Sequence, residues 1–232
     1  MASAGARPQL RRMSHRHCSG AILAGGANTR FAGEAKGLAE VGGRRIVDRA
    51  VEALHGAVDE TFLITNDGRV SAAIPNVRSY PDRYPRRASL VGLHSALWHC
   101  REAVIVVAWD MPFVTSELLS ALRARGEAAH AAVLPLGPRG PEPFCAYYPR
   151  AVIDVVERQI DVGELRLSAF VAALPGVVTL SPNDLTPFGR PEQLFMNVNS
   201  AADLAAARNL DRVNGSSSSE VAAAVASDPE HR

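Results

Sequence analysis

The feature that most constrains this chain is the alternation of short apolar runs, rich in β-branched residues, with segments in which apolar residues recur at helical spacing. The alternation begins near Gly20 and is typical of a parallel sheet whose strands are joined by crossover helices. The run from Ala103 to Trp109 is apolar throughout, as a strand buried on both faces should be. We therefore expect an α/β fold, a single Rossmann-like three-layer α/β/α domain with a mostly parallel central sheet.

The same pattern assigns the individual elements. Strands are expected at residues 19–24, 61–65, 76–80, 103–109, 131–136 and 144–148. Helices are expected at residues 45–54, 90–99, 116–122, 151–159, 165–174 and 201–208. Residues 66–68 are expected to form a turn, and the proline-rich stretch 182–191 a loop.

The two ends of the chain differ in composition from its centre. Residues 1–18 are rich in arginine and lack the apolar core of a secretion signal, which predicts a disordered basic tail. Four consecutive serines follow Asn214 and Gly215, which predicts a flexible Ser-rich tail over residues 211–232. The folded domain is therefore expected to span residues 19–210.

Composition narrows the class of partner. The 25 basic and 24 acidic residues leave a formal net charge of +1, which gives no electrostatic reason to expect nucleic-acid or membrane-surface binding. No apolar run approaches the roughly 20 residues that a membrane span needs. The three cysteines are odd in number and widely spaced, which favours a reducing compartment and hence a cytoplasmic protein. A small molecule is the expected partner.

A glycine-containing stretch, LAGGANTRFAGEAK at residues 23–36, follows the first expected strand. Glycines at 25 and 26 allow backbone N–H groups to approach phosphate oxygens, because no Cβ blocks them. The stretch matches neither the dinucleotide fingerprint nor the P-loop pattern. Arg30 offers a planar fork and Lys36 a compact charge, and together they suit a triphosphate. The alternative is an ordinary turn followed by a solvated charge.

Lys36 is the single lysine among the 25 basic residues of the chain. Arginine serves everywhere else, so a lysine retained at this position indicates that a compact ammonium group is needed there. Close contact with a phosphate is such a need. Chance retention of a loop lysine is the alternative reading.

Asp110 comes directly after the most apolar expected strand. In open parallel sheets ligands bind beyond the carboxyl ends of the strands, and a carboxylate placed there can bind Mg²⁺ next to phosphate oxygens. Pro112 follows closely, so a turn or helix-capping aspartate is the alternative. We favour the metal role.

Other polar residues are expected at the same edge of the sheet. Asp82 follows the third expected strand, and Asn197 and Asn199 follow a short apolar segment. An Asx-turn at Asp82 and a helix cap at Asn199 are the alternatives. Glu142, just before the strand at 144–148, is equally open to interpretation.

Taken in order, these residues resemble the molybdenum cofactor guanylyltransferases of the nucleotidyltransferase superfamily. The resemblance spans about residues 20–210. The stretch 23–36 is similar to the signature loop of that family, and Asn66, Asp82, Asp110 and the segment 197–199 fall where it has its later motifs. The glycine pair at 25 and 26 resembles guanylyl enzymes more than cytidylyl enzymes.

The resemblance implies transfer of GMP from GTP to the phosphate of Mo-molybdopterin, with Mg²⁺ as cofactor and release of pyrophosphate. It implies GTP as the nucleotide and Mo-molybdopterin as the acceptor, with molybdoenzymes or their chaperones receiving the product. The nucleotide contacts that it implies are Leu23, Ala24, Gly25, Gly26, Lys36, Asn66, Asp82 and Asp110. Arg30, Lys36 and Asp110 would be catalytic, Asp110 would hold the metal, and Asn197 and Asn199 would lie on the acceptor or metal side.

Three other readings stay open. A sugar-phosphate nucleotidyltransferase is the nearest, because Thr29 and Arg30 after the glycines also fit that class. A cytidylyltransferase of the same superfamily is the second. The third is an inert module that keeps the fold and binds a nucleotide or cofactor without turnover.

Overall fold

The computed structural model describes residues 16–25, 30–31 and 34–226, with side chains described at 16–25 and 35–214. Its strands are β1 Cys18–Leu23, β2 Arg30–Phe31, β3 Glu34–Ala35, β4 Glu40–Val41, β5 Arg44–Arg45, β6 Glu60–Ile64, β7 Arg78–Tyr80, β8 Ala103–Ala108, β9 Ala132–Gly137, β10 Gly140–Pro141, β11 Cys145–Pro149 and β12 Val177–Leu180. Its α-helices are α1 Ile46–His55, α2 Gly68–Ala73, α3 Ser89–His99, α4 Ser116–Ala129, α5 Ile153–Asp161, α6 Leu167–Ala173, α7 Pro182–Leu185, α8 Pro191–Leu194 and α9 Ala201–Ala226. Two short 3₁₀ helices span Lys36–Leu38 and Arg150–Val152.

The central sheet has eight strands, and its main path runs β10-β9-β11-β8-β1-β6-β7, with β12 pairing with β9. The strands β7, β6, β1 and β8 are mutually parallel. β11 is antiparallel to both of its neighbours, β8 and β9. The expected α/β fold with a mostly parallel sheet is confirmed.

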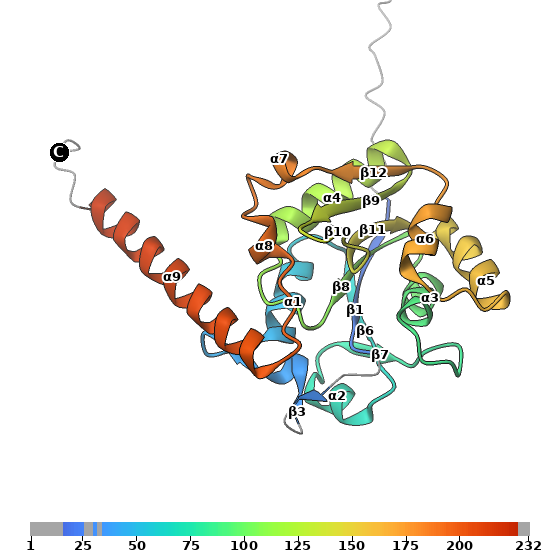
Figure 1. Ribbon diagram of the computed structural model, residues 1–232, viewed down its shortest axis with the longest axis horizontal. Helices are drawn as coiled ribbons and strands as arrows, with labels where there is room; N and C mark the ends of the chain where they lie inside the picture. The colour runs from blue at the N-terminus through green and yellow to red at the C-terminus, as the bar shows by residue number, and fades with distance from the viewer. Residues whose placement is uncertain (1–15, 26–29, 32–33, 227–232) are drawn as a thin grey trace, which may run out of the picture.

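Helices cover both faces of this sheet (Figure 1). One apolar cluster joins α1 and α4 to one face, and a second joins α3, α5 and α6 to the other. The sequence of α1 shows why: its residues Val47, Ala50 and Leu54 recur at helical spacing and are all buried. Burial on both faces makes the three-layer arrangement, as expected.

The structure contains several short elements that the sequence did not predict, among them α2, α7 and β12. Residues 68–73 form α2 instead of continuing a turn, because the Asp67 side chain accepts a hydrogen bond from the Arg69 N–H and caps the helix. The expected loop at 182–191 contains α7, which begins with a capping box between Ser181 and Asp184. The strand β12 precedes it and was not expected.

The last helix is longer than expected. Its start is capped by Asp203 and Ser200, whose side chains bond to each other and to nearby N–H groups. Beyond residue 208, Asp211 forms an ion pair with Arg49 at 2.6 Å, and alanine-rich sequence at 221–226 favours helix. α9 therefore runs through the segment expected as a linker and extends away from the domain (Figure 1). The division into a domain and two tails stays a prediction.

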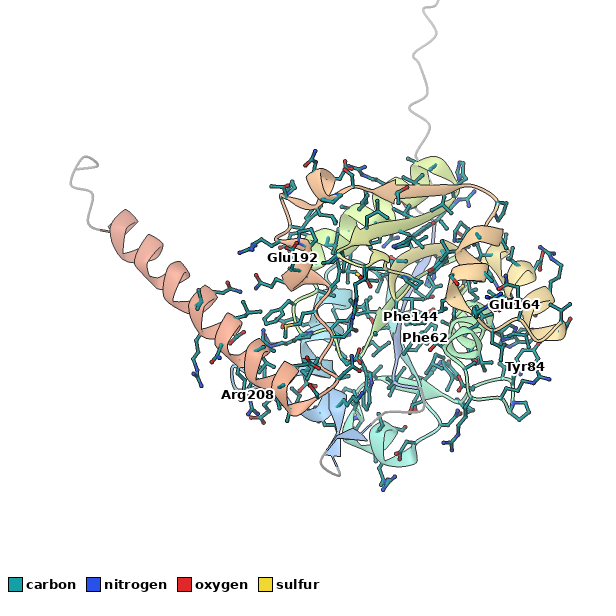
Figure 2. All side chains as sticks on the ribbon, viewed as in Figure 1. Phe62, Tyr84, Phe144, Glu164, Glu192 and Arg208 are labelled. Atoms are coloured by element: carbon teal, nitrogen blue, oxygen red, sulfur yellow. The ribbon has the colours of Figure 1, made fainter. Side chains whose placement is uncertain are left out.

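The first part of α9 is attached to the domain. Leu204 and Ala207 are buried in a small cluster with Val41 and Ile46. Figure 2 shows Arg208 on the same part of the helix, and its Nε donates to the Glu40 carbonyl at 2.9 Å. Within the described ranges, no helix combines the length and apolar character that crossing a membrane requires.

Candidate active site

A cavity of about 660 Å³ lies at the carboxyl edge of the parallel strands. Segments that follow β1, β6, β7 and β8 border it, together with the Lys36 turn and the segment before α9. Its size falls in the range of small-molecule sites. The cavity brings together most of the site residues expected from the sequence: Leu23, Ala24, Gly25, Lys36, Asn66, Asp82, Asp110, Asn197 and Asn199.

The end of β1 forms the first part of the wall. The Ala24 N–H donates to the Ile64 carbonyl at 3.0 Å, and the Thr65 hydroxyl donates to the Ala24 carbonyl at 3.2 Å, which fixes the backbone before the glycines. Gly25 is exposed, and a Cβ placed on it would meet nothing within 4 Å among the described atoms. Gly26 lies outside the described residues, and only the backbone of Arg30 is described.

Lys36 is buried, with 4% of its surface exposed. Its Nζ donates to the Asn199 Oδ1 at 2.8 Å, a contact between residues 163 positions apart in the chain. The next residue, Gly37, packs against the Trp109 ring, where a Cβ would lie 2.4 Å from a ring carbon. The lysine turn is therefore held tightly against the end of β8.

Asp110 lies at the end of β8, half-buried in the wall of the cavity. Burial raises the pKa of its carboxyl above the usual value, while a backbone hydrogen bond and the charge of Lys36 act in the opposite direction. The Val198 N–H donates to the Asp110 carbonyl at 2.9 Å and ties the 197–199 segment to this strand end. The negative charge of this half-buried carboxylate, which is only partly offset by Lys36, would be neutralised by a bound cation.

Donor chemistry at this strand end fits a hard divalent cation. Asn197 donates through Nδ2 to the Phe195 carbonyl at 3.2 Å, which leaves its Oδ1 without a partner among the described residues. The Asp110 carboxylate and this amide oxygen are the kind of ligands that Mg²⁺ takes, with phosphate oxygens and water completing the set. Among the described residues, no group of three or more His, Cys, Asp or Glu side chains gathers as an all-protein metal site. Such a cation would therefore depend on ligands from the substrate.

Asn66 and Asp82 form a pair at the ends of β6 and β7. The Asn66 Nδ2 donates to the Asp82 Oδ2 at 2.6 Å, and the Asp82 N–H donates to the Asn66 Oδ1 at 2.9 Å. Burial raises the pKa of Asp82, against hydrogen bonds from Asn66 and Ser95. The reciprocal bonds make this part of the wall rigid, and no simple Asx-turn accounts for them.

Sequence reasoning overlooked several lining residues. Arg69, Arg87 and Phe144 all border the cavity. The strand-end rule that located Asp82 would also have indicated Arg87, because the arginine-rich loop at 83–87 follows the same strand. Phe144 could not be predicted from the local sequence, because its place depends on the direction of β11. β11 runs antiparallel to β8 and so starts at the edge where β8 ends.

Glu142, left open by the sequence, is not among the lining residues. Its carboxylate lies against Gly137, where a Cβ would be 2.2 Å from its Oε1. Burial raises the pKa of this carboxyl. Glu142 therefore belongs to the β9–β10 hairpin region and not to the cavity.

The chain is similar in sequence to proteins of one known family. A family model described as the MobA-like NTP transferase domain matches residues 20–177. A molybdenum cofactor guanylyltransferase from Desulfosudis oleivorans is 29% identical over 187 residues, covering 80% of this chain and 92% of that protein. One from Cereibacter sphaeroides is 32% identical over 196 residues, covering 83% and 96%.

Among solved structures, a similar fold occurs in molybdopterin-guanine dinucleotide biosynthesis protein A from Archaeoglobus fulgidus. The TM-score is 0.71 at 28% sequence identity, covering 83% of this chain and 97% of that one. The family model ends at residue 177, so it includes the ends of β1, β6, β7 and β8 but not Asn197 and Asn199.

Proposed function

Because the chain belongs to the MobA-like NTP transferase family, we propose that it is a molybdenum cofactor guanylyltransferase. In the proposed reaction GMP passes from GTP to the terminal phosphate of Mo-molybdopterin, and pyrophosphate is released. The names of the relatives from D. oleivorans and C. sphaeroides support the acceptor and the nucleotide. The site must therefore hold two phosphorylated substrates at once.

One observation carries the proposal: the buried Lys36 and the half-buried Asp110 line one cavity together with Gly25. Lys36 supplies positive charge where water is largely excluded, so its interaction with a phosphate is stronger than at an open surface. The Asn199 Oδ1 accepts a hydrogen bond from the Lys36 Nζ and holds the ammonium group in place. This arrangement matches a triphosphate better than a neutral ligand.

The chemistry needs no nucleophile from the protein. An oxygen of the acceptor phosphate forms a bond to the α-phosphorus of GTP, and the bond from that phosphorus to the bridging oxygen of the β-phosphate breaks, so pyrophosphate leaves with the electron pair. Lys36 and Arg30 are the residues that we assign to the charge of the leaving group. Asp110 and Asn197 are the residues that would hold Mg²⁺, and the bound ion would supply further charge neutralisation.

The cellular setting follows from the same proposal. The three cysteines are free and buried, which supports a reducing cytoplasm. The product would pass to a molybdoenzyme or its chaperone, and we expect neither nucleic-acid nor membrane binding.

A substrate matrix tests the proposed function. The protein is incubated with Mg²⁺, each of GTP, CTP, ATP and UTP, and either Mo-molybdopterin or a sugar 1-phosphate, and pyrophosphate release is followed. We expect release with GTP and Mo-molybdopterin, and little without Mg²⁺. Productive use of a sugar 1-phosphate, or of CTP in place of GTP, would contradict the proposal. Nucleotide binding without release in any mixture would indicate an inert binding module.

A further inference from the structure

The two ends of the cavity differ in chemistry. Lys36, Asn199 and Asp110 make one end polar, and they lie with the elements packed on the α1 side of the sheet. The other end, on the α3 side, has the Asp82 carboxylate beside Gly92 but is lined mainly by apolar or side-chain-free positions: Leu23, Ile64, Ala88, Gly92 and Phe144. A nucleoside triphosphate has the same division, since its phosphates are charged and its base is flat and largely apolar on its faces. The base therefore belongs at the α3 end.

The α3 end has room for a planar ring. Gly92 lies on the first turns of α3 and faces Leu23 and Asp82, whose nearest atoms would be 3.7 and 3.9 Å from a Cβ placed on the glycine. A larger side chain would fill the space between this helix and β1. Phe144, near the middle of the molecule in Figure 2, borders the same cavity. These surfaces suit the faces of a purine and leave its edges to polar groups.

Two arginines border the cavity, and their situations differ. Arg69 is already paired with Asp67, at 3.1 Å through Nε and 3.0 Å through Nη2. Arg87 borders the cavity, and its side chain has no hydrogen-bond or ion-pair partner within the described part of the chain. Its five N–H donors are thus available to a ligand.

The loop that carries Arg87 is fixed at several points. The Arg83 N–H donates to the Ser95 hydroxyl at 3.0 Å, and the Tyr84 ring packs edge-on against the buried His94 with 4.8 Å between centroids. Figure 2 shows Tyr84 on the side of the molecule where α3 and α5 lie. α3 begins at Ser89, so Arg87 is held close to a fixed helix end. The guanidinium is therefore presented by an ordered loop, which lowers the entropic cost of binding.

We propose that Arg87 selects guanine, by donating two hydrogen bonds from its guanidinium to the O6 and N7 atoms of the base. This inference rests on the proposed function and deepens it. Guanine presents these two acceptors side by side, and the planar fork of arginine matches their spacing. Adenine and cytosine present an amino group in place of the carbonyl, which would face the N–H groups of Arg87 without a bond. Both bases would leave a donor of the site unsatisfied.

Binding measurements with GTP analogues test the assignment without needing turnover. The dissociation constants of GTP, ITP and 7-deaza-GTP are measured for the wild type, Arg87→Ala and Arg86→Ala. Arg86 is the matched control, because it is an exposed neighbouring arginine that is not among the lining residues and whose Nη1 lies 3.9 Å from a Cβ built on Gly163. ITP keeps O6 and N7 but lacks the 2-amino group, whereas 7-deaza-GTP lacks the N7 acceptor.

We expect the wild type to bind 7-deaza-GTP about tenfold more weakly than GTP. Arg87→Ala should bind GTP and ITP weaker by the same factor, between about 5-fold and 100-fold, and should no longer distinguish 7-deaza-GTP from GTP. Arg86→Ala should behave as the wild type does. Unchanged preference for GTP over 7-deaza-GTP in Arg87→Ala would overturn the inference. A raised KM for the acceptor with unchanged GTP binding would overturn it as well, since Arg87 would then hold the acceptor phosphate.

The failure of this inference is separable from failure of the proposed function. A wild-type protein that turns over CTP, or uses a sugar 1-phosphate, contradicts the proposed function whatever the Arg87 variants show. A wild-type guanylyltransferase whose Arg87→Ala variant keeps the N7 preference contradicts the inference alone.

Discussion

The parallel and antiparallel halves of the sheet contribute unequally to the cavity. In the parallel half, β1, β6, β7 and β8 end at one edge, and each is followed by a residue that lines the cavity. The antiparallel half consists of β11, β9, β10 and β12, in which β11 and β10 run against their neighbours. Phe144, directly before β11, lines the cavity, and none of the described lining residues comes from β9 or β10. β11 is antiparallel to both β8 and β9, so β9 runs in the same direction as β8 and still contributes no lining residue. Position in the sheet, together with strand direction, therefore decides which half carries polar side chains to the site.

The antiparallel half is instead devoted to packing. Tyr147 and Tyr148 of β11 are fully buried and lie on opposite faces of the sheet, one in each large apolar cluster. Burial raises the pKa of Tyr147 to about 12, as expected of a phenol in apolar surroundings. Substitutions at the cavity-lining residues that follow the parallel strands should therefore change activity with little change in stability, and substitutions in the packed antiparallel half should do the reverse.

The largest expected effect is at Asp110. Asp110→Asn removes the charge at the proposed cation site while keeping the shape, and we expect turnover to fall by at least about 100- to 1000-fold. The measurement is pyrophosphate release at saturating GTP, with thermal unfolding as the check on folding. Asp161→Asn, at an exposed position of α5, is the matched control and should keep full activity. Near-normal turnover in Asp110→Asn would contradict the assignment of the cation site to Asp110, and with it the claim that the parallel half carries the activity.

The second effect concerns Lys36. Lys36→Met removes a charge-assisted contact to phosphate and should lower kcat/KM for GTP by about 10- to 100-fold. Asn199→Ala should cost less, because Lys36 remains, and the double variant should be little worse than Lys36→Met, since Asn199 acts through the lysine. Losses that add in the double variant would show that Asn199 contacts substrate independently.

Lys36 and Asn199 also show what sequence reasoning could reach. The apolar run of β8 made Asp110 predictable, because a buried parallel strand needs no long-range information to be recognised. The bond from Lys36 to Asn199 joins residues 163 positions apart, and its geometry depends on how α9 and the lysine turn meet. The local sequence pattern identified both residues as candidates for the site, but it could not predict the hydrogen bond between them.

Local signals were also available and left unused. Ser181 and Asp184 have the spacing of a capping box, so the start of α7 was readable within a stretch taken for a loop. Asp67 was read as part of a turn, although an aspartate before a short helical run equally marks an N-cap. The interpretation of these segments gave more weight to glycine and proline as turn formers than to the capping residues. In the structure the capping residues do start short helices there.

The third effect lies in the antiparallel half. Gly126 of α4 packs against Tyr147, and a Cβ there would lie 2.1 Å from a ring carbon that has no space to retreat. Gly126→Ala should therefore lower the free energy of unfolding by about 1–3 kcal/mol, despite the better helix propensity of alanine. Chemical denaturation measures this, and kcat/KM of the folded protein should be unchanged. Ala124→Gly, on the exposed side of the same helix, calibrates the ordinary difference of about 1 kcal/mol between the two residues. A stabilised Gly126→Ala variant would show that the packing here is loose.

The smallest effect is at Glu142, where stability should depend on pH. Burial raises the pKa of this carboxyl in the folded protein, so the folded state binds a proton more tightly than the unfolded state does. The free energy of unfolding should then fall as pH rises from the usual glutamate pKa through the raised one. Glu142→Gln lacks this carboxyl, and we expect it to be more stable than the wild type at neutral pH by up to about 1 kcal/mol, with the difference vanishing at acid pH. Denaturation of both proteins across this range measures the difference. Unchanged GTP turnover in the variant would support a packing role for Glu142. A loss of turnover would instead indicate a role in the active site.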